Sequence, residues 1–218
     1  MLYIKIAMVE EFIINNTEIV SFPLLREIKL RVLTEKSRFF YAKESEFLRF
    51  GIVDPFFLFC WPGGQALSRF ILDNSELIKG KGVLIFGSGC GVEAIASVLC
   101  GAKYVLASDI DPNALVMSSI NMRLNEVDFE LTDSDFFLSD CSEFDVILAG
   151  DMYYDKDMTE KIFGWFARLK DRVLVLGADP LRGYVDHQRI KILKIYDTLK
   201  DGEVYTNRLI KTPVFTII

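Results

Sequence analysis

The sequence has 218 residues, which is enough for one sizeable core and makes a single domain the expected arrangement. Apolar residues make up 51% of it, yet no stretch approaches the roughly 18 uninterrupted apolar residues of a membrane-spanning helix, so we expect a soluble protein without a membrane partner. The formal net charge of −6 lacks the attraction to phosphate backbones that nucleic-acid binders usually show, so no nucleic-acid partner is expected.

The first sixty residues differ in residue pattern from the rest of the sequence. Residues 1–20 contain three glutamates and one basic residue, unlike an arginine-rich presequence, so no targeting signal is predicted. Residues 23–36 predict a basic helix, and residues 38–46 form an aromatic and charged segment. We expect an N-terminal helical extension over residues 1–60 that serves as a lid or faces the substrate. No linker separates it from residues 61–218, which predicts one domain over residues 1–218.

Strands and helices alternate through the middle of the chain. Strands are predicted at residues 81–86, 104–108, 144–149 and 172–177, and helices at residues 92–99, 113–124 and 157–169. Short apolar strands separated by helices are typical of a doubly wound, mostly parallel sheet. Residues 203–218 are rich in β-forming side chains and predict an antiparallel pair at the sheet edge.

A glycine loop joins the first of these strands to its helix. In Gly87-Ser88-Gly89-Cys90-Gly91 the missing side chains let the backbone turn sharply and approach a ligand. A dinucleotide site requires Gly-x-Gly-x-x-Gly, but the third glycine comes one residue earlier, so the loop favours S-adenosylmethionine over NAD. An ordinary strand-to-helix turn and an NAD-dependent dehydrogenase are the alternatives.

Acidic residues follow the next two strands. Asp109 ends the second strand, where a carboxylate can accept hydrogen bonds from both ribose hydroxyls of a nucleoside, and Ile110 would then lie against the adenine. Asp135 is a candidate for the adenine amino group, and a solvated acidic loop explains it nearly as well.

The four cysteines and the single histidine are spread along the chain. Cys60, Cys90, Cys100 and Cys141 form no Cys-x-x-Cys pair and have no companion histidine cluster, which predicts neither a metal site nor a disulfide framework. Reduced thiols indicate an intracellular compartment.

One string upstream of the glycine loop is specific. Trp61-Pro62-Gly63-Gly64-Gln65-Ala66-Leu67 resembles the signature of the electron transfer flavoprotein beta subunit lysine methyltransferases. The resemblance continues through Leu72-Asp73-Asn74, the glycine loop, Asp109-Ile110-Asp111-Pro112 and Gly150-Asp151-Met152-Tyr153-Tyr154-Asp155, and covers about residues 38–179.

The resemblance implies a Rossmann-like, seven-stranded methyltransferase fold and an S-adenosylmethionine-dependent protein-lysine N-methyltransferase. It implies the flavoprotein beta subunit as substrate and a place in the mitochondrial matrix or the cytoplasm. We also expect a monomer. The residues assigned to the cofactor are Trp61, Gly87, Ser88, Gly89, Gly91, Asp109, Ile110, Asp135 and Gly150.

The family's Asp-x-Phe-Tyr motif maps onto Asp151, Met152, Tyr153 and Tyr154, with tyrosine in the third place. Asp151 follows a buried strand and is assigned to the incoming lysine ammonium, with Tyr154 and Tyr153 as walls of the lysine channel. A helix N-cap is the alternative for Asp151, packing is the alternative for the tyrosines, and closure of the core is the alternative for Trp61.

Two more departures from the family pattern stand out. The acidic residue that usually precedes the glycine loop by two positions is Ile85 here, and the Gly-Asp-Pro-Gly-Arg element is altered to Gly177-Ala178-Asp179-Pro180-Leu181-Arg182. A scaffold protein that lost its cofactor therefore stays open as a second function class, beside a methyltransferase acting on another protein or a small amine.

Overall fold

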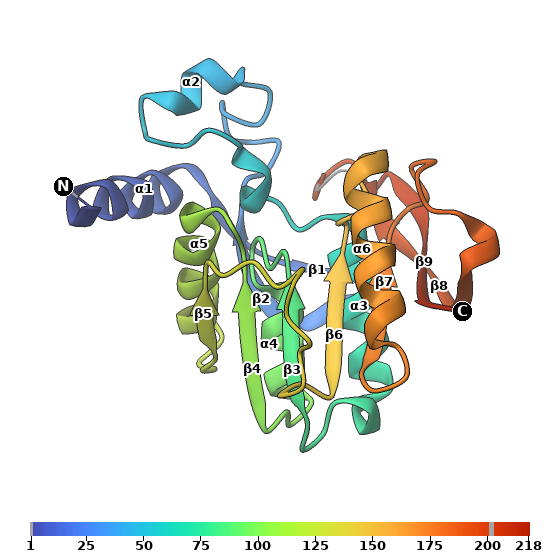
Figure 1. Ribbon diagram of the computed structural model, residues 1–218. Coiled ribbons are helices and arrows are strands. Elements are labelled where there is room, and N and C mark those ends of the chain that lie inside the picture. Colours follow the sequence, from blue (N-terminus) through green and yellow to red (C-terminus); the bar gives the residue numbers. More distant parts are fainter. Residues whose placement is uncertain (1, 201–202) are drawn as a thin grey trace.

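A seven-stranded sheet forms the centre of the molecule (Figure 1). The computed structural model describes residues 2–200 and 203–218. The strand order is β5-β4-β3-β6-β7-β9-β8. The first five strands run parallel, whereas β9 lies antiparallel to both β7 and β8. The strands are β3 (Gly82–Phe86), β4 (Tyr104–Ser108), β5 (Glu130–Thr132), β6 (Val146–Gly150), β7 (Leu174–Ala178), β8 (Ile190–Leu199) and β9 (Leu209–Ile217).

Helices cover both faces of the sheet, which confirms the doubly wound α/β fold. The main helices are α3 (Pro62–Asp73), α4 (Val92–Leu99), α5 (Pro112–Leu124) and α6 (Lys156–Leu169), with short 3-10 turns η1 (Pro55–Leu58), η2 (Ser75–Leu77) and η3 (His187–Arg189). Alternate residues of β3 separate the two faces: Val83 and Ile85 pack in the core with α3, α4 and α5, whereas Leu84 and Phe86 pack with α6. Of the helices in the described part of the chain, none has the length and apolarity to cross a membrane.

The N-terminal extension contains a β-hairpin, so the prediction of a helix at residues 23–36 was wrong. The extension comprises α1 (Leu2–Asn16), the hairpin of β1 (Glu18–Phe22) and β2 (Leu25–Val32), and α2 (Glu44–Leu48). Ile28, Leu30 and Val32 of β2 are buried at every second position, and this period of two fits a strand.

The extension and the sheet share one core. Phe12 of α1 contacts the rings of Phe39, Phe47 and Phe50, and three of these four rings belong to the same buried cluster as Ile95 of α4. Figure 1 shows α2 beyond the carboxyl end of the sheet. Buried side chains of residues 1–60 therefore pack in the same core as those of the sheet and its helices.

The antiparallel edge pair lies partly outside the predicted residues. The long strand β8 begins at Ile190, before the predicted region, and pairs with β9 over nearly its whole length. Five consecutive residues of β8, from Lys191 to Ile195, are exposed, so this strand has no alternating pattern to reveal it.

Candidate active site

The glycine loop connects the end of β3 to the start of α4. Its glycines have positive φ angles of 71° at Gly87, 49° at Gly89 and 82° at Gly91, a backbone conformation that side chains rarely adopt. The amides of Gly87 and Ser88 both donate to the Ser108 carbonyl at 2.9 Å, which ties the loop to the end of β4. A Cβ placed on Gly89 would have no atom within 4 Å. The loop therefore has open space in front of Gly89.

Asp109 fastens the loop from the neighbouring strand. One carboxylate oxygen accepts from the Gly89 amide at 2.9 Å, and the other accepts from the Asp111 amide at 3.0 Å. Burial raises the pKa of Asp109, and the two backbone donors oppose the rise. Ile110 beside it is 75% exposed, so an apolar side chain faces solvent next to this carboxylate.

Two of the residues assigned to the cofactor turn away from the loop. The Ser88 side chain is buried, and its hydroxyl lies 3.4 Å from the Ser118 hydroxyl on α5. Its amide donates to Ser108 and its carbonyl accepts from the Gly91 amide, so its polar groups are engaged within the protein. Asp135 is exposed and accepts from the Phe137 amide within its own loop at 2.9 Å. The structure therefore does not decide between the two roles considered for Asp135, binding of the adenine amino group and membership of a solvated acidic loop.

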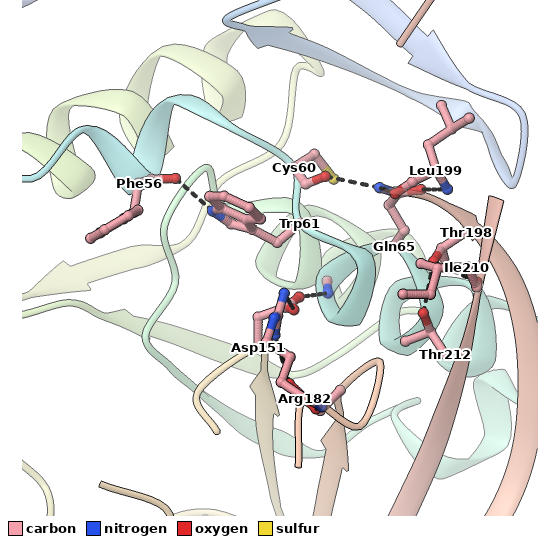
Figure 2. Close-up of polar contacts among 12 residues, drawn as sticks. Phe56, Cys60, Trp61, Gln65, Asp151, Arg182, Thr198, Leu199, Ile210 and Thr212 are labelled. Carbon is pink, nitrogen blue, oxygen red and sulfur yellow. Dashed lines mark hydrogen bonds and ion pairs between the residues drawn. The ribbon is translucent and has the colours of Figure 1, made fainter. Parts of the chain in front are cut away.

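Asp151 follows β6 and reaches across to the start of α3 (Figure 2). One carboxylate oxygen accepts from the Gly64 amide at 3.0 Å, and the other lies 2.8 Å from a guanidinium nitrogen of Arg182. Burial raises the pKa of Asp151 to about 6, and the Arg182 cation opposes the rise. The N-cap of α6 is Asp155, which accepts from the Met158 amide at 2.8 Å, so the helix-capping alternative for Asp151 is wrong.

Arg182 was not identified from the sequence as a site residue. It also pairs with the fully buried Asp179 at 2.6 Å, so one guanidinium holds two carboxylates at the ends of β6 and β7. The only local signal was the altered element at residues 178–182. The partner Asp151 lies 31 positions away in the chain, and local patterns do not reveal such a pairing.

A glycine at the start of α3 and a glycine at the end of β6 make room for carboxylates. A Cβ on Gly63 would lie 2.5 Å from Asp151 Oδ2 and 2.4 Å from the Ala178 carbonyl. A Cβ on Gly150 would lie 2.4 Å from an oxygen of Glu93, another residue that the sequence did not point to. Glycine at these positions lets α3, β6 and α4 approach one another closely.

Gln65 connects the start of α3 to β8, the strand at the edge of the sheet. Its amide nitrogen donates to the carbonyls of Cys60 and Leu199 at 2.9 and 3.1 Å, and its oxygen accepts from the Leu199 amide at 2.9 Å (Figure 2). The start of α3 is therefore fixed by β8 as well as by Asp151.

The two tyrosines after Asp151 have different surroundings. Tyr154 is half-exposed, and its pKa is raised by burial and by the carboxylates of Asp155, Asp109 and Asp54. Tyr153 is fully buried against Phe163 and Phe215. The assignment of Tyr153 to a channel wall is thus wrong for this conformation, and packing is its role.

Trp61 stands at the start of α3 and is partly exposed. Its indole nitrogen donates to the Phe56 carbonyl at 2.8 Å (Figure 2). The centre of its ring lies 5.3 Å from that of the Phe59 ring. The ring therefore packs on the segment that precedes α3, and a contact of Trp61 with a cofactor stays a prediction.

Among the residues that the structure describes, no group of three or more His, Cys, Asp and Glu side chains could hold a metal ion.

The sequence has relatives of known family over most of its length. It is 37% identical to the human electron transfer flavoprotein beta subunit lysine methyltransferase over 180 residues, covering 80% of this chain and 67% of that protein. It is 38% identical to the Danio rerio protein of the same name over 187 residues, covering 84% of this chain and 71% of that protein. The chain belongs to this lysine methyltransferase family.

Other comparisons agree with a methyltransferase and are coarser. The matched part spans only 59% of the rat and mouse relatives. The family model of ribosomal protein L11 methyltransferase (PrmA) matches residues 65–151. The fold is also similar to the ribosomal protein L11 methylase of Lactobacillus delbrueckii, with a TM-score of 0.52 at 17% identity over 92% of this chain and 98% of that one.

Within the lysine methyltransferase family, the departure at Tyr153 has a structural cost. Its hydroxyl is buried without a hydrogen-bond partner among the described residues, and a Cβ on Gly177 would lie 2.3 Å from it. The desolvated hydroxyl costs free energy that the phenylalanine of the family motif does not.

Tyr153→Phe should therefore raise the free energy of unfolding by about 1 kcal/mol and leave methyl transfer unchanged. Urea unfolding and a methylation assay check this, with Tyr154→Phe as the matched control at the exposed ring. A drop in activity on Tyr153→Phe alone would return Tyr153 to the lysine channel.

The departure at Leu181 introduces backbone strain. Leu181 has a φ angle of 58°, in the left-handed region, at the position where the family element has glycine. We expect Leu181→Gly to be more stable than Leu181→Ala by about 1 kcal/mol, because both lose the side-chain contacts but only alanine keeps a strained Cβ. Thermal unfolding of the two variants measures the difference, and equal stability would show that this φ angle carries no strain.

Proposed function

We propose that this chain is an S-adenosylmethionine-dependent protein-lysine N-methyltransferase whose substrate is the electron transfer flavoprotein beta subunit. The substrate follows from the names of the relatives, which share 36–41% of their residues with it over most of the chain. The observation that carries the cofactor is the pairing of Asp109 with the Gly89 amide beside open space.

The residues present fit the cofactor. Asp109 keeps free lone pairs for ribose hydroxyls, Ile110 offers an exposed apolar surface for an adenine, and the unfilled space at Gly89 admits a ligand close to the backbone. A related fold, SMU.776 with a TM-score of 0.56 at 12% identity, was solved in complex with S-adenosylhomocysteine. When bound, the cofactor supplies a methyl group activated by its sulfonium.

Asp151 and Tyr154 provide the lysine side of the reaction. Asp151 lies at the carboxyl end of β6, where open α/β sheets bind their ligands, and its ionised form attracts an ammonium. The half-exposed ring of Tyr154 offers a face to the same cation. A lysine must lose a proton before it can accept a methyl group. The Asp151 charge raises the lysine pKa, so the partly apolar surroundings must lower it and water takes the proton.

The remaining assignments are part of the same proposal. We expect a monomer that acts on a protein and binds neither nucleic acid nor membrane, in the cytoplasm or the mitochondrial matrix. The net charge of −6 supports the expectation of no nucleic-acid partner, and the absence of a long uninterrupted apolar stretch in the sequence supports the expectation of no membrane partner.

Calorimetry is the direct test. The purified protein should bind S-adenosylmethionine and S-adenosylhomocysteine but not NAD. Asp109→Ala should abolish this binding, whereas Asp133→Ala, on the next loop, should keep it. A bound cofactor leads to the second step, in which the flavoprotein beta subunit is incubated with methyl-labelled cofactor. Absence of binding by the wild-type protein would favour the scaffold alternative that Ile85 suggests, and binding without labelling would point to another amine.

A further inference from the structure

A buried glutamate lies behind the start of α3 and has no role in the assignments above. Glu93, the second residue of α4, is 3% exposed. A Cβ on Gly150 would lie 2.4 Å from its Oε1, and a Cβ on Gly64 would lie 3.5 and 3.6 Å from its two oxygens. Its carboxyl group therefore lies between the end of β6 and the first turn of α3, next to the glycine loop that leads into α4.

Glu93 has no cation to balance it. Among the described residues, the donor that reaches its carboxyl group is its own backbone amide. The ionisable groups that interact with it are not cations: they are the Asp151 carboxylate after β6 and the Cys60 thiol of the segment before α3. The guanidinium of Arg182 is held by Asp151 and Asp179. Burial of an acid without a partner costs free energy, which a ligand of opposite charge can offset.

The other carboxylates of the site each have partners from other residues of the protein. Asp109 accepts from two backbone amides, and both oxygens of Asp151 are engaged by Gly64 and Arg182. The end of β3 offers only the apolar Ile85, which faces the same side of the sheet as α4. Glu93 is thus the carboxyl group at the glycine loop that has no partner from another described residue.

We propose, on the basis of the function proposed above, that Glu93 binds the ammonium group at the amino-acid end of S-adenosylmethionine. The amino-acid end of this cofactor carries a primary ammonium, and a buried carboxylate is the side chain that recognises such a group most strongly. Glu93 takes this role from the first turn of α4, because β3 provides no acid at its end.

The proposal has a consequence for protons. Burial raises the pKa of Glu93 to about 8, and the charge of Asp151 adds to this rise, so in the free protein Glu93 is mostly protonated at pH 7. An ammonium ion at the carboxyl group favours the ionised form. Binding therefore transfers the Glu93 proton to the solvent, and the ion pair forms between carboxylate and ammonium.

The test compares two ligands that differ only beyond the thioether. S-adenosylhomocysteine has the amino-acid end, whereas 5′-methylthioadenosine lacks it. Glu93→Gln should weaken binding of S-adenosylhomocysteine about 10- to 100-fold, the range for a charge-assisted hydrogen bond, and leave the affinity for 5′-methylthioadenosine within about twofold. Calorimetry at pH 7 in buffers of different ionisation enthalpy should detect proton release for wild-type protein with S-adenosylhomocysteine and none for Glu93→Gln.

Asp109→Asn is the matched control, since it should weaken both ligands by the same factor, and thermal unfolding of each variant verifies the fold. The inference is overturned if Glu93→Gln binds S-adenosylhomocysteine with wild-type affinity and proton release, or weakens both ligands equally. A variant that binds both ligands normally but has a higher KM for the protein substrate would assign Glu93 to the substrate lysine instead. Failure of the wild-type protein to bind either ligand would contradict the proposed function itself.

Discussion

Arg182→Met should lower the free energy of unfolding by about 3 kcal/mol at pH 8, because it leaves Asp151 and Asp179 as buried carboxylates without their shared cation. The loss should shrink at pH 5. In the wild-type protein the pKa of Asp151 is about 6, whereas its ordinary value is 3.8. Between these two pH values the folded state binds more protons than the unfolded state, so the free energy of unfolding falls as pH rises. Without Arg182 the pKa of Asp151 rises further, and this fall continues to higher pH.

The same substitution should change the pH profile of methyl transfer. At pH 7 a larger share of Asp151 will be protonated and unable to attract an ammonium, so the acid limb of kcat/KM should move to higher pH and the rate at pH 9 should recover in part. Denaturant unfolding at both pH values and rate profiles between pH 6 and 10 measure this. Arg182→Lys, which keeps the charge, is the control. If the acid limb of kcat/KM does not move in Arg182→Met, the ionisation of Asp151 does not control the rate.

Gly63→Ala should remove methyl transfer and lower the free energy of unfolding by about 3 kcal/mol. The added Cβ would meet the Ala178 carbonyl at 2.4 Å, Asp151 Oδ2 at 2.5 Å and the Asp151 amide at 2.6 Å, and two of these are backbone atoms that cannot rotate away. The first turn of α3 would have to leave β6 and β7, and the Gly64 amide would lose the Asp151 carboxylate.

Two alanine substitutions serve as controls for Gly63→Ala. A Cβ on Gly64 comes no closer than 3.1 Å to the side chain of Val92, so Gly64→Ala should be much milder. Gly164 lies on an exposed part of α6 with nothing within 4 Å, and Gly164→Ala should stabilise the protein by about 1 kcal/mol through helix propensity. Thermal unfolding and the methylation assay rank the three variants. Equal effects at Gly63 and Gly64 would mean that close packing against Asp151 is unimportant.

The parts of the site that the sequence predicted are those set by local order. Strand, glycine loop and helix follow one another within residues 81–99, and Asp109 comes at the end of the next parallel strand, so their meeting at Gly89 follows from the topology of a parallel sheet. The placement of Asp151 after β6 has the same origin.

The parts that it did not predict depend on contacts between distant segments. Arg182 reaches Asp151 from the loop after β7, and Glu93 has no local feature that distinguishes it from a solvated helix acid. Residues 23–36 were misread because basic side chains alternate with apolar ones in a strand whose inner face packs on α5. Tyr153 and Tyr154 are adjacent in the sequence, and only the tertiary structure shows which of them is buried.

The position of β9 affects how the protein can be made. This strand follows β8 in the sequence but inserts between β7 and β8, and Leu199 at the end of β8 holds Gln65 at the start of α3. A ribosome releases the N-terminal segments first, so β7 has an unpaired edge until residues 209–217 have emerged. During that interval the nascent chain exposes an edge of the kind that pairs with other chains. This edge is protected once β9 has paired with β7, and the same pairing brings β8 into the sheet beside α3.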